Sequence, residues 1–365
     1  MSNVYQIYPF YPVHPVKNMD LLFRPLAFIA GALVTSVAIF SAVQTFVLPR
    51  SANDPVARLV FRGMRRLFDL LSIRASSYHA RDRIMALYAP FGVLALLPTW
   101  LAMILLGYTA MFWGSGVEPW YQAFKVSGSS LLTLGFATAD RFGQALLEYS
   151  EATIGLMLVA LLIAYMPSMY SAFSRREAAV TLLEVRAGNP PSAVEMIKRF
   201  YRIHGLDRLG EQWQAWESWF ADVEESHTSL AALVFFRSPR PDRSWVTAAG
   251  AVLDAASLAR SVVDIPADPR ADLCIRAGYL ALRSIADFFR FPYHTDPHYP
   301  SQAISLSRAD FEAACAELAA QGVPLKVDRE QAWRDFAGWR VNYDETLLAL
   351  ARLTMAPPSP WTGER

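Results

Sequence analysis

The hydroxyl-rich tract "SGSSLLTLGFATAD", residues 127–140, lies between two uncharged apolar runs. It combines serine and threonine with small and apolar residues, and its one charged residue is Asp140. The chemistry open to such a tract is coordination of a cation, because backbone carbonyl oxygens can replace the hydration shell of an ion. The carbonyls would have to face a cavity, so the surrounding elements decide whether this chemistry is possible.

Three apolar runs are long enough to cross a membrane and carry no charged residue: residues 25–48, 86–113 and 152–173. As a helix, the run 86–113 would be about 42 Å long, which exceeds a hydrocarbon core of roughly 30 Å. The alternative of a buried core helix is disfavoured by this length and lack of charge. The chain is 53% hydrophobic and only 18% charged, which also indicates a partly membrane-embedded protein.

Charge asymmetry predicts the orientation of these spans. The segment 50–83 has eight arginines against three aspartates, and Arg175 and Arg176 follow the third run. The loop 114–151 is acidic by four residues to two. Because positive loops stay in the cytoplasm, we expect a multi-pass protein of the cell membrane with residues 1–24 outside and the C-terminal half in the cytoplasm.

Between the first two spans, residues 49–85 read as a basic amphipathic segment. Apolar residues recur at helical spacing with arginines between them: Val56, Val60, Met64, Leu67 and Leu71. One interpretation is a helix on the inner leaflet, with anionic lipid headgroups near Arg58, Arg62, Arg65 and Arg66. The other is a surface helix of the cytoplasmic domain.

The loop 114–151 is too short and too apolar for an ordinary soluble insertion. Pro119 is placed to begin a helix, which could dip into the membrane from outside before the chain returns in extended form. Non-helical backbone at membrane depth is tolerated only where protein or water surrounds it. A re-entrant loop here would therefore imply a cavity, and a cavity lined by carbonyls is an ion path.

At this point residues 86–173 resemble the pore domains of potassium channels, in which a span, a tilted pore helix, a T-V-G-Y-G-D filter and a second span follow in order. Thr133, Leu134, Gly135 and Phe136 match T-V-G-Y conservatively, and Ser130 stands where the family often has Thr or Ser. The resemblance implies that the Thr133 hydroxyl and the next three carbonyls form oxygen rings, with Ser130 as support. It also implies permeant K⁺ ions and no other cofactor.

Two residues depart from the family's filter. Ala137 replaces the second glycine, and Thr138 replaces the following acid, although Asp140 could supply that charge at the mouth. Alanine in a left-handed conformation is strained by about 1–2 kcal/mol, so we expect the outer carbonyl ring to be absent or reshaped. Cation conduction is therefore a firmer expectation than potassium selectivity.

The run 152–173 would be the inner, pore-lining helix. By the same resemblance, Gly155 and Pro167 are candidate hinges of an inner gate; the alternative is close packing and a tolerated kink. The chain has one such loop and no internal repeat, so a closed ring of carbonyls needs four copies, a homotetramer.

Residues 174–355 predict a cytoplasmic domain of five to seven helices, because helical spacing recurs and strand-like alternation does not. The Pro-rich tail 356–365 is expected to be disordered. The predicted fold is thus an all-α membrane protein. We find no nucleotide-binding loop, P-loop or nucleophile motif, which argues against an enzyme. The net charge of +1 argues against nucleic-acid binding.

Smaller clusters in this half allow two interpretations each. His294, Asp296 and His298 could bind a metal or lie in a solvated loop. The loop arginines Arg237, Arg240 and Arg243 could grip an anionic ligand or lipid headgroups, or be solvated. Tryptophans three residues apart suit a core or a subunit interface better than a ligand cage: Trp213, Trp216 and Trp219. The two cysteines, Cys274 and Cys315, are expected to be reduced and buried.

The function expected from the sequence is a tetrameric membrane cation channel, most simply potassium-conducting, with TLGFAT as its filter. Two alternatives remain open: a weakly selective cation channel, and a non-conducting membrane-anchored interaction protein with a degenerate pore loop.

Overall fold

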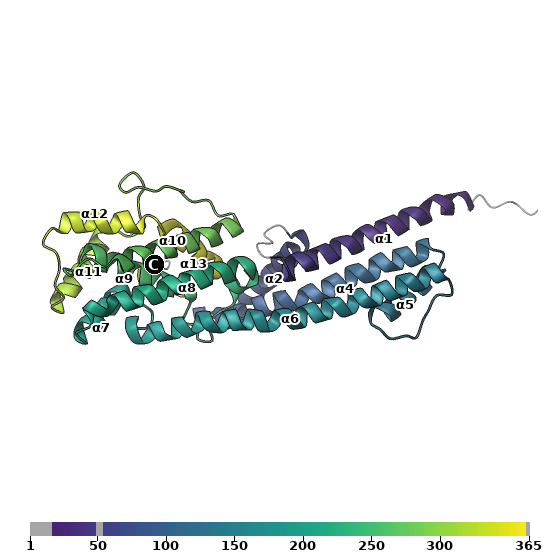
Figure 1. The fold of residues 1–365 in the computed structure, drawn as a ribbon, viewed down its shortest axis with the longest axis horizontal. Coiled ribbons are helices and arrows are strands. Elements are labelled where there is room, and N and C mark those ends of the chain that lie inside the picture. Colours follow the sequence, from purple (N-terminus) through teal and green to yellow (C-terminus); the bar gives the residue numbers. More distant parts are fainter. Residues whose placement is uncertain (1–16, 49–53, 363–365) are drawn as a thin grey trace, which may run out of the picture. The chain divides into compact units, whose positions relative to one another are not determined.

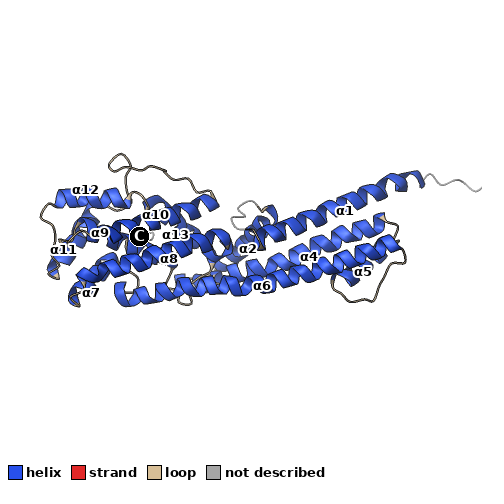
Figure 2. Ribbon diagram, in the orientation of Figure 1, coloured by secondary structure: helices blue, strands red, loops and turns tan. Residues whose placement is uncertain are grey.

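The computed structural model describes residues 17–48 and 54–362. These residues form helices α1 to α13 and two short 3₁₀ helices, and none of them forms a strand (Figure 2). One isolated antiparallel bridge joins Val263 and Leu325. The prediction of an all-α protein is confirmed for the described residues.

The chain divides into two compact units. We call Met1–Phe46 with Ala95–Ile163 the membrane unit, and Val47–Leu94 with Ala164–Arg365 the core unit. Helices α4 and α6 contribute residues to both. Each unit is described by itself.

The membrane unit contains helices α1 (Lys17–Phe46), α4 (Tyr88–Gly114), α5 (Trp120–Leu131) and the first part of α6 (Phe142–Ala187). Three helical stretches are long and apolar enough to cross a membrane: Leu22–Phe46, Tyr78–Gly114 and Phe142–Ala187 (Figure 1). By length and composition the chain is therefore a multi-pass membrane protein. The third helix extends beyond the predicted run 152–173 at both ends.

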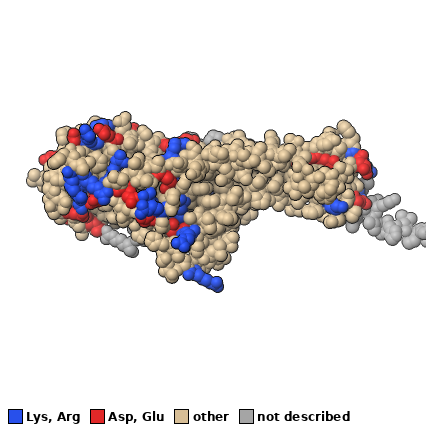
Figure 3. Space-filling view, turned by 90° about the horizontal axis from the view of Figure 1, so that it is seen from below, with Lys and Arg blue, Asp and Glu red and all other residues tan. Residues whose placement is uncertain are grey.

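Small residues bring α1 and α4 together. A Cβ added to Gly31 would overlap the carbonyl oxygen of Gly107, and Trp100 Nε1 donates a hydrogen bond of 2.8 Å to Ser41 Oγ. Glycines at a helix crossing allow the backbones to approach closely, which is a common basis for helix association in membranes. The visible face of this unit is free of charged side chains except at one end (Figure 3).

The core unit is built from α2 (Pro55–Ser72), α3 (Tyr78–Met85), the second part of α6, and seven further helices. These are α7 (Ala193–Arg202), α8 (Leu209–Ser229), α9 (Trp245–Ser261), α10 (Pro269–Phe289), α11 (Arg308–Ala320), α12 (Arg329–Arg340) and α13 (Asp344–Thr354). The 3₁₀ helices are η1 (Leu206–Arg208) and η2 (Ala231–Phe235). The seven helices lie within the predicted five to seven.

Helix α9 forms the centre of this unit, because nearly all of its residues are buried and α7, α10, α12 and α13 pack around it. Ser244 caps its N-terminus by accepting a hydrogen bond from the Val246 amide. The tryptophans of α8 lie in the same core, with the rings of Trp216 and Trp219 4.5 Å apart. The prediction that they are core residues is confirmed.

A buried ion cluster joins α9, α12 and α13. Arg340 donates to Asp254 Oδ1 at 2.5 Å and to Asp344 Oδ1 at 2.7 Å, and none of its side chain is exposed. Burial disfavours the charged guanidinium, but the two carboxylates outweigh this effect and raise the pKa of Arg340. The guanidinium of Arg340 is thus a buried cation between two carboxyl groups, while Asp254 Oδ2 has no hydrogen-bond partner among the described residues.

The prediction of a disordered tail was wrong for residues 356–362. Arg340 also donates to the Trp361 carbonyl at 2.8 Å, and Thr362 is fully buried. The Trp361 ring packs edge-on against Phe336, and Ser359 Oγ donates to the Pro191 carbonyl at 3.0 Å. The contacts of Trp361, Ser359 and Thr362 thus dock a Pro-rich segment that composition alone assigns to disorder.

Helix α2 packs one of its apolar sides against the rest of the core unit, and other apolar side chains of this segment are exposed. Phe68 is buried with Met85 and Tyr88, and Phe61 and Met64 pack against them. Arg65 bonds to Asp69 at 3.1 Å and stacks over the Tyr88 ring. Leu59, Leu70 and Ile73 are exposed. Of the stripe that the sequence suggested, Met64 packs on this cluster whereas Leu67 and Leu71 are exposed, and Arg65 belongs to a protein contact.

Candidate functional site

Helix α5 begins as the sequence predicts. Pro119 is its N-cap residue, and the helix runs from Trp120 to Leu131. Residues 132–141 are not helical, and α6 begins at Phe142. The first five residues of the predicted tract thus belong to α5, and we use the name tract from here on for residues 132–138, in the connection between this short helix and the long apolar α6.

Helix α5 is held between α4 and α6 at points far from their ends. Ser127 Oγ lies 3.0 Å from the Leu105 carbonyl oxygen and 2.6 Å from Glu151 Oε1. At about 1.5 Å per residue, Leu105 is about 13 Å along α4 from its last residue. A Cβ added to Gly155 would lie 2.5 Å from the Leu131 carbonyl oxygen, and Gly155 is about 20 Å along α6 from Phe142.

Residues 132–136 of the tract are exposed. Leu134 is 59% exposed and Phe136 is 61% exposed. Thr133 and Gly135 have left-handed φ values of 54° and 70°. Among the described residues, no group donates a hydrogen bond to the carbonyl oxygens of residues 133–136. These carbonyls are available to a partner outside the chain.

Two amide groups at the end of the tract are bonded to side chains. The Ala137 N–H donates to Ser129 Oγ at 3.1 Å, and the Ala139 N–H donates to Glu148 Oε1 at 2.6 Å. The expected left-handed conformation is absent at Ala137 and occurs at Thr133 instead. Thr138 is exposed beside Ala137.

The supporting side chains differ from those expected. Ser130 is half-buried and Asp140 is exposed, and neither side chain forms a hydrogen bond among the described residues. Ser129 and Glu148 bond to the tract instead. The sequence signal for Ser129 was the run of adjacent serines, but only the phase of α5 decides which of them is buried. From the sequence, Glu148 is recognisable only as one of the acidic residues of the loop 114–151.

Gly155 and Pro167 both lie within the continuous helix α6. Gly155 is buried at the crossing with the C-terminal end of α5, where a side chain has no room. This observation favours packing as the reason for the glycine. Pro167 is exposed, and the helix continues on both sides of it.

The loop arginines of the core unit form internal contacts. Arg237 is paired with Asp82 and donates to the Thr354 carbonyl at 2.6 Å. Arg240 and Arg243 both contact Glu184. An anionic ligand would have to displace these partners.

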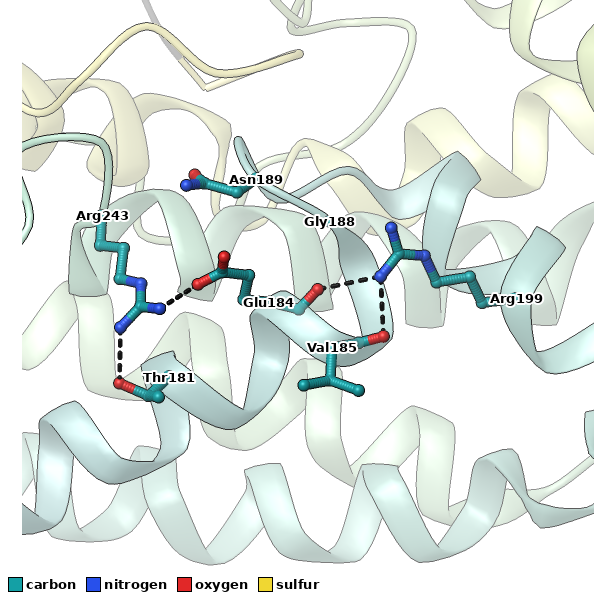
Figure 4. A pocket seen from close by; sticks show the side chains of 7 residues that line it. All are labelled: Thr181, Glu184, Val185, Gly188, Asn189, Arg199 and Arg243. Atoms are coloured by element: carbon teal, nitrogen blue, oxygen red, sulfur yellow. Dashed lines mark hydrogen bonds and ion pairs between the residues drawn. The ribbon is translucent and has the colours of Figure 1, made fainter.

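A hollow of about 500 Å³ lies beside these arginines, lined by Thr181, Glu184, Val185, Gly188, Asn189, Arg199 and Arg243 (Figure 4). Arg243 contacts Glu184 and donates to Thr181 Oγ1 at 3.0 Å, and Arg199 donates to the Val185 carbonyl at 2.7 Å. Its charges are therefore already paired within the chain.

The histidine cluster and the two cysteines also belong to the core unit. His298 Nδ1 contacts the Asp296 carbonyl at 3.1 Å, and the described residues contain no group of three side chains arranged to hold a metal ion. Cys274 and Cys315 are free and buried, as predicted. Burial raises the pKa of both thiols, to about 11 for Cys315.

No model of a protein family, no curated protein and no solved structure matches this chain. The likeness to potassium-channel pore domains therefore depends on the residues of the tract and its place between two apolar helices.

Proposed function

We propose that this protein is one subunit of a homotetrameric cation channel and that residues 133–136 supply the oxygens of its filter. Thr133 would contribute its hydroxyl and carbonyl, and Leu134, Gly135 and Phe136 their carbonyls. Permeant K⁺ ions would be the only bound species, and the first ring of oxygens would lie nearest the end of α5.

The observation that carries this proposal is the set of four consecutive carbonyls without an internal partner, at the end of a short helix seated deep between two apolar helices. Unpaired carbonyls in a hydrocarbon environment cost several kcal/mol each. Surrounding copies of the chain, water and ions would supply the missing partners. The exposed Leu134 and Phe136 side chains would likewise be covered by neighbouring subunits.

Selectivity follows from the number of oxygen rings. Ala137 has its N–H bonded to Ser129 and an ordinary φ, so this residue would supply no oxygen ring. A filter with fewer rings than T-V-G-Y-G provides fewer sites at which K⁺ and Na⁺ are compared. We therefore expect conduction of K⁺ with measurable Na⁺ permeability.

The proposed orientation has residues 1–24 and the loop 114–151 outside and the core unit in the cytoplasm, from the arginine excess of residues 50–83. Phe142, which is 82% exposed, and Val327, which is 97% exposed, provide matched labelling positions. In intact cells, F142C should react with an impermeant maleimide and V327C should react only after permeabilisation. The opposite pattern would reverse the orientation.

Currents test the function directly. Purified protein in planar bilayers with asymmetric KCl and NaCl should give unitary currents, and native mass measurement in detergent should give four copies. Gly135→Ala should reduce or abolish the current, because an added Cβ meets no atom within 4 Å but strains the left-handed backbone. Gly143→Ala also meets no neighbouring atom and serves as the control.

Each outcome separates the alternatives. A tetramer without current in any condition would support the membrane-anchored interaction protein instead. A stable monomer or dimer would contradict both the filter and the tetramer. Currents that are indifferent to Gly135→Ala would show that conduction does not use the carbonyls of this tract.

A further inference from the structure

We propose that Glu148 and Glu151 of α6 are positioning residues that hold TLGFAT in the conformation that selects ions. This inference deepens the proposed function and rests on it. The two carboxyl groups are three residues apart, which places them on one side of α6, about one turn from each other.

Glu151 holds the helix that precedes the tract. Its side chain is fully buried, and Oε1 lies 2.6 Å from Ser127 Oγ. Oε2 is buried without a hydrogen-bond partner among the described residues, and no Lys or Arg forms an ion pair with Glu151 there. A polar group in such a site is costly, so its single partner, Ser127, fixes the position of α5 on α6.

Glu148 holds the chain that follows the tract. Its Oε1 accepts the Ala139 N–H at 2.6 Å, a short distance that fits a hydrogen bond to a charged acceptor. Together with the bond from the Ala137 N–H to Ser129 Oγ, this contact fastens the end of the tract to side chains of α5 and α6. The carbonyls of residues 133–136 are left free.

Both ends of the tract are therefore held by one short stretch of α6. The end that follows α5 is held through Ser127 and Glu151, and the other end is held through Ala139 and Glu148. The distance between entry and exit determines how closely successive carbonyls can be spaced. A change in either bond would alter that spacing and so the discrimination between K⁺ and Na⁺, even in a channel that still assembles and conducts.

The test compares side chains that keep or lose the hydrogen bond. Glu148→Gln and Glu151→Gln retain an acceptor of the same length, whereas Glu148→Ala and Glu151→Ala remove it. Thr153→Ala is the matched control, since Thr153 is exposed on the same helix and its hydroxyl donates to the Tyr149 carbonyl of that helix. The reversal potential under KCl and NaCl gradients is measured for each variant, with native mass measurement of the tetramer.

We expect the alanine variants to lower the K⁺ to Na⁺ permeability ratio by about fivefold, the factor that corresponds to a net hydrogen bond of about 1 kcal/mol. The glutamine variants and Thr153→Ala should stay within about twofold of the parent. Because an alanine variant could fail to assemble, Ser127→Ala is measured as well and should reproduce the effect of Glu151→Ala. Hydrogen exchange of the Ala139 amide should be faster than in the parent protein in Glu148→Ala, and in none of the other variants.

The outcomes separate this inference from the proposed function. Conducting tetramers of the alanine variants with an unchanged reversal potential would overturn the inference and leave the channel intact. If the glutamine variants shifted the reversal potential as much as the alanine variants, the inference would also be overturned, because charge rather than hydrogen bonding would then be the cause. A parent protein without current would overturn the proposed function and, with it, the selectivity role.

Discussion

Two buried acids, one in each unit, show how differently the two regions are stabilised. Asp254 in the core unit faces Arg340 at 2.5 Å and also accepts from the Tyr343 hydroxyl at 2.9 Å. Glu151 in the membrane unit faces the Ser127 hydroxyl and forms no ion pair with a described residue. The core unit places an arginine against its buried acid, although Asp254 Oδ2 has no hydrogen-bond partner among the described residues, whereas the buried acid of the membrane unit has a hydroxyl group as its partner.

The same contrast appears in the apolar surfaces. Helix α9 is buried on almost all sides by its own unit. In the membrane unit, large apolar side chains of the tract and of α6 are exposed, among them Leu134, Phe136 and Leu156. Lipid covers some of this surface, and neighbouring subunits would cover the rest under the proposed function. The core unit is thus nearly self-sufficient, and the membrane unit depends on its surroundings.

The largest effect is expected from breaking the paired charge of the core unit. Arg340→Met should destabilise this unit by about 3–5 kcal/mol, because Asp254 and Asp344 would remain buried without their cation. Urea titration of the full-length protein in detergent, followed by tryptophan fluorescence, measures the loss. Arg334→Met in the same helix is the control, since Arg334 is an exposed partner of Glu330. Equal effects of both variants would refute the argument.

A smaller effect is expected at the helix crossing of the membrane unit. Gly155→Ala places a methyl group 2.5 Å from the Leu131 carbonyl oxygen, and overpacking of this kind costs about 1–3 kcal/mol. The melting temperature in detergent should fall and the tetramer should be less abundant. Gly143→Ala should leave both unchanged. A wild-type melting temperature for Gly155→Ala would contradict the close packing of α5 on α6.

The third prediction concerns pH and the core unit alone. Arg176 Nη1 lies 3.1 Å from His227 Nε2, and since arginine can only donate, this nitrogen accepts and the ring is neutral. Burial and the neighbouring guanidinium lower the pKa of His227 well below its ordinary value. The unfolded chain therefore binds the additional proton, so stability is full above about pH 6.5 and falls as the pH decreases.

We expect a loss of about 1.4 kcal/mol between pH 7.5 and pH 5.5, because the unfolded histidine titrates near the middle of this range and each pKa unit corresponds to about 1.4 kcal/mol. Unfolding of the full-length protein across this range measures it. His227→Gln, which cannot bind a proton, should lose this part of the pH dependence. An identical slope in the variant would show that other groups cause it.

The smallest effect is expected for the native thiols. Cys315 has a pKa raised to about 11 by burial, so about 0.1% of it is thiolate at pH 8. Neither Cys274 nor Cys315 should react with maleimide within minutes in the folded protein, whereas the exposed V327C should react completely. Rapid labelling of the parent protein would mean that the core unit opens readily.

The sequence by itself determined the elements that depend on composition and local pattern. Three charge-free runs, each long enough to span the hydrocarbon core of a bilayer, predicted three membrane helices. Length and lack of charge are properties of each run alone, so they can be recognised without knowing what the run packs against. Pro119 predicted the start of α5, since its fixed φ suits a helix start. The three-residue spacing of the tryptophans of α8 predicted a core or subunit interface, and the residue type of the two cysteines predicted their burial.

Only the tertiary structure decided where backbone groups and side chains meet. Besides Gly135, the left-handed residue of the tract is Thr133 rather than Ala137, whose amide is bonded to Ser129. The roles of Glu148 and Glu151 depend on the phase of α6 against α5, and the docking of Trp361 depends on an unsatisfied donor of Arg340. These are contacts between residues distant in sequence, and no local pattern specifies their geometry.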